Sequence, residues 1–419
     1  MDTPASEQLF IGSERGEILQ HPREKKRFKF FIETATGCFG DCPGCAFTDT
    51  ERSHTKPLIE EHLIPLLFKR LKELVDPSHP SSLIDEQDTI IINFGAADHL
   101  LYETHYLDVL FGEASKFFKE VGTKRNISSF STSGLMNPEK MLEKIETMKK
   151  HFQGEKFAVN FVVDLARFKR LEDRYQASLD MLLKHTRYVD LGVNLESYSD
   201  ERDWDAFISF ANRNPILNVN IAYPLNRNNA HRVSLEAGKI FSIYQRMSMS
   251  VQAGYSLIDT QRSFSNPFSD PLPGTTDLLD ISLAEACQLG AESILSNALF
   301  IRSDLMVFPV MFIVFTDIPL NDRLGQQSIG HLFDPDLNVK IAAHKNILAD
   351  NLANIFSHSR QCHDCEIVNH CYHTGAPLLN PQLNTFHGVP VKRAAECQNP
   401  ARPFILEQTG KWHSRQNPT

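Results

Sequence analysis

Three closely spaced cysteines early in the chain are the residues with the clearest chemical potential. Cys38, Cys42 and Cys45 follow the spacing C-x3-C-x2-C within the segment 36–47. Three thiolates on one short loop can hold three irons of a [4Fe–4S] cube and leave the fourth iron open to bind a small molecule and pass it an electron. A zinc site without its fourth ligand, or three unrelated thiols, are the alternatives. Such crowding is improbable by chance, because the chain has only 8 cysteines in 419 residues.

Four further cysteines near the C-terminal end form a second candidate metal centre. Their spacing is C-x2-C-x5-C-x25-C, and four thiolates complete a tetrahedral ligand set. Taken alone, the set suits a fully ligated [4Fe–4S] cluster and a structural zinc equally well. The four cysteines, with the histidines that stand near them, are Cys362, Cys365, Cys371 and Cys397, and His363, His370 and His373.

The composition is that of a globular protein with a mild acidic excess. The chain has 43 Lys+Arg against 52 Asp+Glu, a formal net charge of −9, and 42% hydrophobic residues, which is enough to bury a core. The acidity argues against a nucleic-acid partner. No secretory signal is visible, and the longest apolar stretch, Leu305–Phe315, is too short for a membrane span of about 20 residues. We therefore expect a soluble cytoplasmic protein, in whose reducing compartment clustered cysteines are more often metal ligands than disulfides.

Strand-like and helix-like segments alternate through the first half of the chain. Amphipathic stretches at 57–75, 105–121 and 138–152 separate runs of apolar or β-branched residues. This alternation predicts βαβ units and a parallel sheet in an α/β fold. The expected strands are Phe28–Thr34, Thr89–Asn93, Ile127–Thr132, Phe157–Val163, Val189–Leu195 and Leu217–Tyr223.

The periodicity weakens after about residue 225, which suggests a change of organisation. Segments 232–246, 280–291 and 338–356 look helical, and 305–333 suggests an antiparallel section. The expected division is an N-terminal extension at 1–26, an α/β body at 27–230, a bridging helical region at 231–300 and a cysteine-bearing domain at 301–419.

The first cysteine motif resembles that of the radical S-adenosylmethionine (SAM) enzymes, in which C-x3-C-x2-C follows the first strand of a partial (β/α)6, TIM-like barrel. The resemblance covers about residues 27–225. It implies a [4Fe–4S] cluster on Cys38, Cys42 and Cys45 whose open iron binds SAM. One electron, from an external donor such as flavodoxin or ferredoxin, then cleaves SAM to methionine and a 5′-deoxyadenosyl radical that abstracts a substrate hydrogen.

Segments after the second and third strands are similar to the SAM-binding motifs of that family. Where the family has Gly-Gly-Glu-Pro, Gly95 and Ala96 keep the small size and Asp98 keeps the carboxylate, but the proline is absent. Thr132 and Ser133 belong to Ser-Thr-Ser-Gly, which resembles the family's Thr-Asn-Gly. The resemblance implies that these residues contact SAM.

The fourth strand ends in polar residues at the face where barrel sites lie. By resemblance, Asn160 or Asp164 contacts the ribose of SAM. Arg167 or Arg174 pairs with its carboxylate, a bidentate role that suits arginine. Each of these residues, taken alone, is more often a solvated turn residue.

The sequence departs from the family directly before Cys45. The family has an aromatic residue there that packs near the adenine, whereas this chain has Gly44. Phe39 and Phe47 are the candidates to take over that contact.

The C-terminal segment looks like the SPASM domain, which follows the barrel in many radical SAM enzymes and normally carries two auxiliary clusters. Val310 and Gly375 stand where two ligands of the inner cluster would be, while all four cysteines of the outer set remain. The resemblance therefore implies one auxiliary [4Fe–4S] cluster in a SPASM-like or twitch-like domain. Electron transfer or structural support is its expected role.

Enzymes with a SPASM domain most often modify peptides or proteins. The expected substrate is therefore a ribosomally made peptide or protein, which is crosslinked, joined through a thioether, epimerised or oxidised. The leader-binding module of many such enzymes is not expected in residues 1–26. A small metabolite of the aminoglycoside type is the alternative, and the strand-end residues Asp190, Asn194 and Tyr223 suit either class.

Cys287 is the eighth cysteine and lies in an expected helix. Free cysteines are usually buried core thiols. Radical SAM epimerases quench a substrate radical with a cysteine thiol, so the resemblance also allows a hydrogen-donor role.

A different class of protein remains as a further alternative, namely a non-catalytic iron–sulfur protein that carries electrons or acts as a scaffold. The motifs at 95–98 and 132–134 argue against it.

Overall fold

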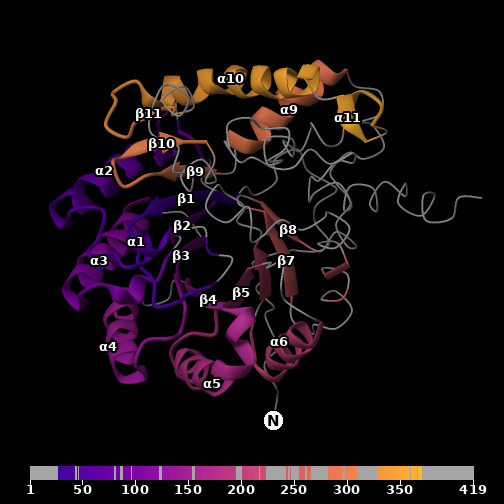
Figure 1. Cartoon of the computed structure of the whole chain (residues 1–419). Helices are drawn as coiled ribbons and strands as arrows, with labels where there is room; N and C mark the ends of the chain where they lie inside the picture. Colours follow the sequence, from indigo (N-terminus) through magenta and orange to yellow (C-terminus); the bar gives the residue numbers. More distant parts are fainter. Residues whose placement is uncertain are drawn as a thin grey trace, which may run out of the picture.

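The protein is built on one curved sheet with helices along its outer side, as a computed structural model shows (Figure 1). The sheet is 11-stranded, in the order β11-β10-β9-β1-β2-β3-β4-β5-β6-β7-β8. The structure describes residues 27–42, 45, 47–79, 82–84, 88–95, 97–121, 125–152, 156–194, 201–216, 218–222, 242–243, 246, 254–259, 262–265, 282–295, 298–309, 328–358, 360–365 and 367–369.

All neighbouring strands from β9 through β1 to β7 are parallel, whereas β8, β10 and β11 pair antiparallel. A parallel sheet with helices between successive strands is the arrangement of a partial TIM-like barrel. The strands are β1 (Arg27–Glu33), β2 (Thr89–Gly95), β3 (Arg125–Thr132), β4 (Lys156–Val163), β5 (Val189–Asn194), β6 (Asn218–Ala222), β7 (Gly254–Asp259), β8 (Arg262–Ser265), β9 (Ala298–Ile301), β10 (Met306–Phe308) and β11 (Gly330–His331).

The helices between successive strands lie outside the sheet, while α9 and α10 lie above β9, β10 and β11 (Figure 1). Local signals start them: Pro138 opens α4, and Asn137 before it accepts hydrogen bonds from two backbone N–H groups of the first turn. The helices are α1 (Asp49–Arg52), α2 (Ile64–Val75), α3 (Thr104–Val121), α4 (Pro138–Lys149), α5 (Phe168–His185), α6 (Glu201–Arg213), α9 (Leu283–Leu295), α10 (Leu337–His358) and α11 (Arg360–His363), with short 3-10 turns η1 (Glu61–Leu63), η2 (His99–Leu101) and η3 (Leu165–Arg167).

Each central strand has two faces with different surroundings, because side chains alternate along a strand. Phe30, Phe130 and Phe161 lie on the outer face, in the main apolar core beneath the helices. The opposite face points into the barrel, where Ile91 and Ala158 belong to a separate small apolar cluster. The polar residues considered below share this inner face with that cluster.

The sequence prediction of the barrel is confirmed, since the six expected strands begin and end within two residues of β1 to β6. The expected antiparallel section and following helix correspond to β10, β11 and α10. The description of 231–300 as a helical region is wrong in part, because β7 and β8 extend the sheet there. Within Gly254–Asp259, Tyr255-Ser256-Leu257 alternates apolar and polar residues, but the segment is too short to give a clear strand signal. The domain boundaries stay a prediction.

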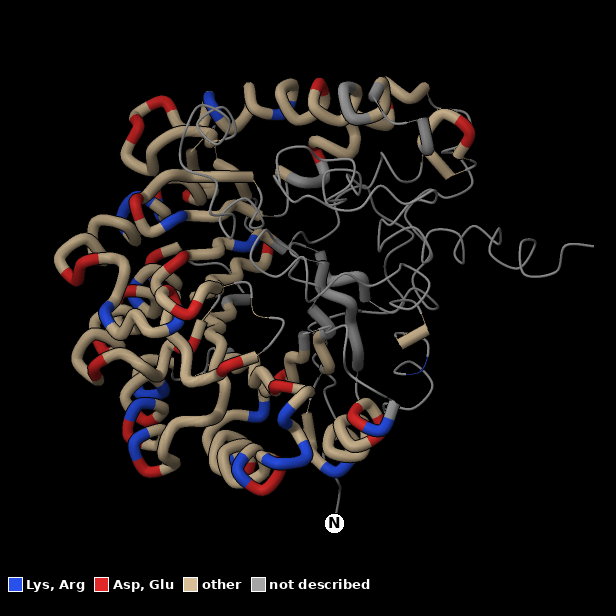
Figure 2. The backbone as a smooth tube through the Cα atoms, in the orientation of Figure 1, with Lys and Arg blue, Asp and Glu red and all other residues tan. Residues whose placement is uncertain are grey.

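Charged residues of both signs are interspersed over the outer helices (Figure 2). Among the helices that the structure describes, none combines the length and the apolar character needed to cross a bilayer.

Candidate functional site

The three cysteines after β1 line one cavity at the ends of the barrel strands. Loops that follow four neighbouring parallel strands meet there, as the carboxyl ends of barrel strands do. The walls are formed by Cys38, Gly40, Cys42, Cys45 and Phe47 after β1, Ala97 and Asp98 after β2, Ser131, Thr132, Ser133 and Leu135 at the end of β3, Val162 and Asp164 at the end of β4, and Tyr175 of α5.

The cysteine loop is held by its own backbone and by α1. Cys38 N–H donates to the carbonyl oxygen of Arg52 at 3.0 Å, and Cys45 N–H donates to that of Cys42 at 3.0 Å. Thr48 and Glu51 cap α1 reciprocally, so the helix that carries Arg52 starts at a fixed residue. These contacts tie the described residues of the loop to one another and to α1.

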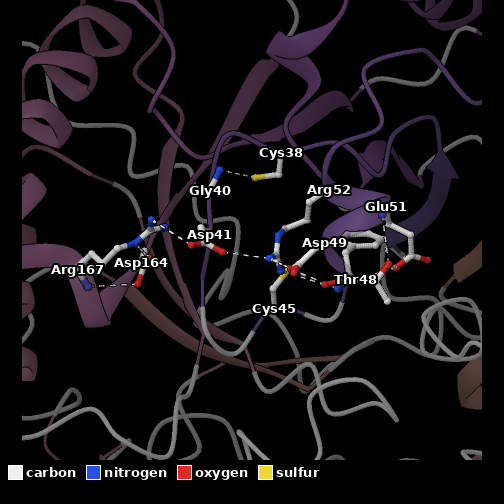
Figure 3. Close-up of polar contacts among 11 residues, drawn as sticks. Cys38, Gly40, Asp41, Cys45, Thr48, Asp49, Glu51, Arg52, Asp164 and Arg167 are labelled. Atoms are coloured by element: carbon white, nitrogen blue, oxygen red, sulfur yellow. Dashed lines mark hydrogen bonds and ion pairs between the residues drawn. The ribbon is translucent and has the colours of Figure 1, made fainter.

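Two arginines connect the cysteine loop to its surroundings (Figure 3). Arg52 donates to the carbonyl oxygen of Phe47 at 3.1 Å and pairs with Asp41 at 3.1 Å and with Asp49. Asp41 also lies 3.9 Å from a guanidinium nitrogen of Arg167. Burial opposes the charge of Arg52, yet a hydrogen bond to the Cys45 sulfur and nearby negative charges raise its pKa. Arg52 is not among the residues predicted from the sequence, although the Thr48–Glu51 capping signature marks a helix beside the motif.

Asp98 is fully buried and joins three loops. Its backbone N–H donates to the carbonyl oxygen of Gly37 at 2.9 Å. Oδ1 accepts from the N–H of Leu100 at 3.2 Å, and Oδ2 accepts from Ser133 N–H at 2.9 Å and Ser133 Oγ at 2.6 Å. Burial raises its pKa, although the hydrogen bonds of Ser133 and Thr132 lower it. Asp98 lines the cavity, and both of its carboxylate oxygens are used to hold loops.

The turn after β3 requires a glycine. Gly134 has φ +64°, and a Cβ there would lie 2.2 Å from the ring of Phe161. Its N–H donates to Thr132 Oγ1 at 3.1 Å, which closes the turn and presents Ser133 to Asp98. The Ser-Thr-Ser-Gly segment therefore shapes the cavity wall by its backbone as much as by its side chains.

Buried Asp164 and half-buried Arg167 form an ion pair after β4. Asp164 is 1% exposed and caps η3, accepting from Arg167 N–H at 3.3 Å, while its other oxygen pairs with the guanidinium. Nη2 of Arg167 is buried and, within the described residues, has no hydrogen-bond partner. Arg174 is exposed and donates to the carbonyl oxygen of Leu135. Of the two predicted arginines, Arg167 is the one with a buried donor atom that has no partner among the described residues.

The remaining predicted cofactor contacts are distributed as follows. Asn160 lies on the inner face of β4 and donates to Ser131 Oγ at 3.3 Å. Gly95 ends β2 beside the cavity, and Ala96 lies outside the described residues. Phe47 lines the cavity, whereas Phe39 is 41% exposed and does not. Of the two aromatic candidates, Phe47 is therefore the one that lines the cavity.

Burial dominates the acid–base chemistry of the cavity. It raises the pKa of Cys38 to about 12, with a further contribution from the charge of Asp98. It lowers the pKa of His99, behind the cavity, to about 4. His99 therefore stays neutral, and its Nε2 lies 2.7 Å from Thr34 Oγ1. The Cys38 thiol keeps its proton at neutral pH until a metal displaces it.

The cysteine loop offers the thiol donor set that an iron–sulfur cube uses. In the described part of the chain, no three metal-ligating side chains lie close enough together to hold a single metal ion. A cube needs only that each thiolate reach a different iron. A Cβ at Gly40 would lie 3.3 Å from Cys38 Sγ and 3.6 Å from Cys42 Sγ. Because Gly40 has no side chain, no atom of this residue crowds the space between the two thiols.

The second set of cysteines is described only in part. Cys362 is buried, at the end of α11, and Cys365 N–H donates to the carbonyl oxygen of Cys362 at 3.2 Å. Cys371 and Cys397 lie outside the described residues, so the auxiliary cluster stays a prediction. Cys287 is 2% exposed within α9 and belongs to the main apolar core, not to the cavity lining.

Of the residues predicted to line a substrate cavity, Asp190 is not at the carboxyl end of its strand. It is the second residue of β5, and Asn194 is the last. Tyr223 lies outside the described residues.

Comparison with known proteins identifies the fold. No protein-family model and no curated protein matches the sequence. Among solved structures, polyhistidine-tagged anSMEcpe with bound AdoMet aligns with TM-score 0.53 at 12% identity, over 93% of this chain and 97% of that chain. Native anSMEcpe with bound AdoMet aligns with TM-score 0.51 at 12% identity, over 94% of this chain and 100% of that chain. The chain therefore has a partial TIM-like α/β fold like that of anSMEcpe.

Proposed function

We propose that this protein is a radical SAM enzyme. The observation that carries the proposal is the meeting of Cys38, Cys42 and Cys45 in one cavity with the loops that follow β2, β3 and β4. The fold shared with AdoMet-bound anSMEcpe supports it. When bound, a [4Fe–4S] cluster with an open iron supplies the electron that cleaves SAM and so yields the radical that abstracts a substrate hydrogen.

The chain's own residues bind and orient in this proposal. Cys38, Cys42 and Cys45 hold the cluster, and Phe47 packs beside the adenine. Arg167 pairs with the SAM carboxylate through its uncommitted Nη2, because a buried guanidinium nitrogen without a partner favours an anion. Asp164 holds the Arg167 guanidinium in place.

Loop positions around SAM depend on Asp98, Thr132 and Ser133. Asp98 ties the loops after β1, β2 and β3 together, which keeps the carbonyl groups near Gly95 and Ala96 close to the SAM ammonium. Asn160 lies on the inner side of the sheet next to the cavity wall, and its Oδ1 has no hydrogen-bond partner among the described residues.

We further propose that the substrate is a peptide or protein and that flavodoxin or ferredoxin supplies electrons in the cytoplasm. A small metabolite is the second candidate. Cys362, Cys365, Cys371 and Cys397 would hold one auxiliary [4Fe–4S] cluster in a SPASM-like domain. These proposals depend on the sequence resemblance.

Anaerobic reconstitution tests the main proposal. We expect about eight irons per chain for two cubes, a reduced-cluster electron paramagnetic resonance signal that SAM changes, and 5′-deoxyadenosine formation. Cys38→Ser should abolish the last two while Cys287→Ser keeps them. An unchanged signal together with no 5′-deoxyadenosine from the wild type would show that the proposal is wrong. An iron content of about four per chain would refute the proposed auxiliary cluster and leave the radical SAM proposal standing.

The role of Arg167 is tested by SAM affinity. Arg167→Gln should weaken binding at least about tenfold, because it removes a charge from a partly buried site. Arg170→Gln, an exposed neighbour on α5, is the matched control. Equal affinities for the two variants would exclude Arg167 as the carboxylate contact.

A further inference from the structure

Two buried oxygen atoms inside the barrel have no hydrogen-bond partner among the residues that the structure describes. They are Oδ1 of Asn160 on β4 and Oδ1 of Asp190 on β5. Buried polar atoms are nearly always satisfied, because an acceptor removed from water without a new donor lowers stability. Two such atoms on adjacent strands therefore indicate a function rather than a support of the fold.

The two residues belong to one row of the sheet that begins at the cavity wall. Ser131 pairs in register with Asn160, and Asn160 pairs with Asp190. Residues in register on neighbouring strands point to the same face. Ser131 lines the cysteine cavity, so the row leads from that cavity into the barrel interior. The neighbours Val159 and Val189 lie in the core under the helices, on the opposite face.

The other polar atoms of the pair are already engaged. Asp190 Oδ2 accepts from Asn220 Nδ2 at 3.3 Å, and Asn160 Nδ2 donates to Ser131 Oγ at 3.3 Å. Burial raises the pKa of Asp190 to about 7, although Asn220 and the more distant charge of Lys29 lower it. Among the residues that the structure describes, the hydrogen bond from Asn220 and the charge of Lys29 offset the burial of this carboxylate only in part.

Gly192 lies two residues after Asp190 on the inner face of β5 and has no side chain to fill the space there. A Cβ there would lie 2.9 Å from Asn160 Oδ1 and 3.2 Å from Val162 Cγ2. Val162 lines the cavity and is the register partner of Gly192. A larger residue would push the Asn160 amide aside and occupy the space between Asp190 and the cavity wall.

We propose that Asp190 and Asn160 bind a protonated primary amino group of the substrate through their two free oxygens. The proposal depends on the proposed function, in that the substrate enters the barrel from the cysteine cavity. An ammonium group donates up to three hydrogen bonds, and its positive charge compensates the negative charge of the buried carboxylate. A hydroxyl group would satisfy an oxygen without compensating the charge, and an anionic group would be repelled.

The test compares probes that differ only in the amine. Nα-acetyl-lysine amide and Nα-acetyl-norleucine amide have the same carbon chain, and n-butylamine and n-butanol repeat the comparison without a peptide. Binding is measured by calorimetry on the reconstituted full-length enzyme under anaerobic conditions without turnover. We expect at least one amine to bind at least about tenfold more tightly than its matched probe, since a buried charge pair has that effect. The amine that binds distinguishes a lysine side chain from a small-molecule amine.

Two variants assign the effect to this row. Asp190→Asn should abolish the preference for the amine while raising the melting temperature at pH 8, an effect that a merely structural aspartate would not show. Gly192→Ala should weaken amine binding at least about tenfold with the carboxylate intact. Asp173→Asn, on the exposed side of α5, should change neither quantity.

The proposal is overturned if amines bind no better than their matched probes, or if Asp190→Asn and Gly192→Ala both keep the preference. A failure of the radical SAM function would look different. Amine binding would persist, and it would still depend on Asp190, while no 5′-deoxyadenosine formed with SAM.

Discussion

Buried polar groups occur in two regions of the barrel, the loops around the cysteine cavity and the inner row of β4 and β5, and the two regions use them differently. In the loops, Asp98 and Asp164 have both oxygens engaged by donors of the fold. In the inner row, Asp190 and Asn160 each have one buried oxygen with no hydrogen-bond partner in the part of the chain that the structure describes. Carboxylates of the first kind hold the structure together, whereas those of the second kind lower its stability and persist where function needs them. Replacing a loop carboxylate should therefore lower the free energy of unfolding, whereas replacing Asp190 should raise it.

The largest expected effect is at the loop after β3. Gly134→Ala should lower the free energy of unfolding by about 4 kcal/mol, because a left-handed alanine is strained and its Cβ would overlap the Phe161 ring. Urea unfolding measures the loss. The control is Gly112→Ala in α3, where the added Cβ meets only the end of the His151 side chain at 3.3 Å and alanine favours the helix. Equal stability of the two variants would mean that the turn is not constrained as described.

The second expected effect is at the link between loops. Asp98→Ala should cost about 3 kcal/mol, because the N–H groups of Leu100 and Ser133 lose their acceptor in a buried site. Asp98→Asn, which keeps one acceptor oxygen, should cost less. Denaturant unfolding measures both losses, and hydrogen exchange at the two amides should accelerate in the alanine variant. Unchanged exchange would contradict a linking role.

The third prediction is a gain in the free energy of unfolding, where the first two are losses. The pKa of Asp190 is raised from 3.8 to about 7 by burial, so the wild type loses stability as pH rises from about 4 through 7. The difference corresponds to at most about 4 kcal/mol. Asp190→Asn removes this loss but buries an amide with unpartnered donors, which costs about 2 kcal/mol. The variant should therefore gain about 2 kcal/mol at pH 8 and almost nothing at pH 5.5. Urea unfolding at the two pH values measures this.

The control for that experiment is Asp173→Asn, whose exposed carboxylate should leave stability unchanged within about 0.5 kcal/mol. If Asp190→Asn instead lost the same stability at both pH values, Asp190 would stabilise the fold as Asp98 does. The proposed difference between the two regions would then be wrong.

The sequence was sufficient to predict the barrel strands and to indicate which end of the barrel the motifs share. Strands buried under helices are near-continuous apolar runs, and the carboxyl ends of parallel strands converge. Motifs at the ends of β1 to β4 therefore had to meet, as Cys38, Asp98, Ser133 and Asp164 do. β7 and β8 were missed because they are short and half polar, and because the surrounding segment weakens the periodic signal.

The roles of individual side chains could not be predicted in the same way. Whether Asp98 faces a ligand or a neighbouring loop depends on the positive φ of Gly134, which sets where Ser133 points. The neighbours of Asp190 depend on the register of β4 with β5, and register is a relation between strands that no single segment contains. The contact of Arg52 with the cysteine loop likewise exists only in the fold.

Cys287 belongs to neither region and gives the smallest predicted effect. It is 2% exposed in α9, and burial raises its pKa to about 11, so its neutral thiol packs as a small apolar side chain. Cys287→Ala should cost about 1 kcal/mol in urea unfolding, as the loss of one packed core atom does, and should leave 5′-deoxyadenosine formation unchanged. Its matched control, Cys38→Ala, should do the reverse at the cavity, with 5′-deoxyadenosine formation lost. Unchanged stability of Cys287→Ala together with altered turnover would favour the hydrogen-donor role, because a core thiol affects the reaction only through the stability of the fold.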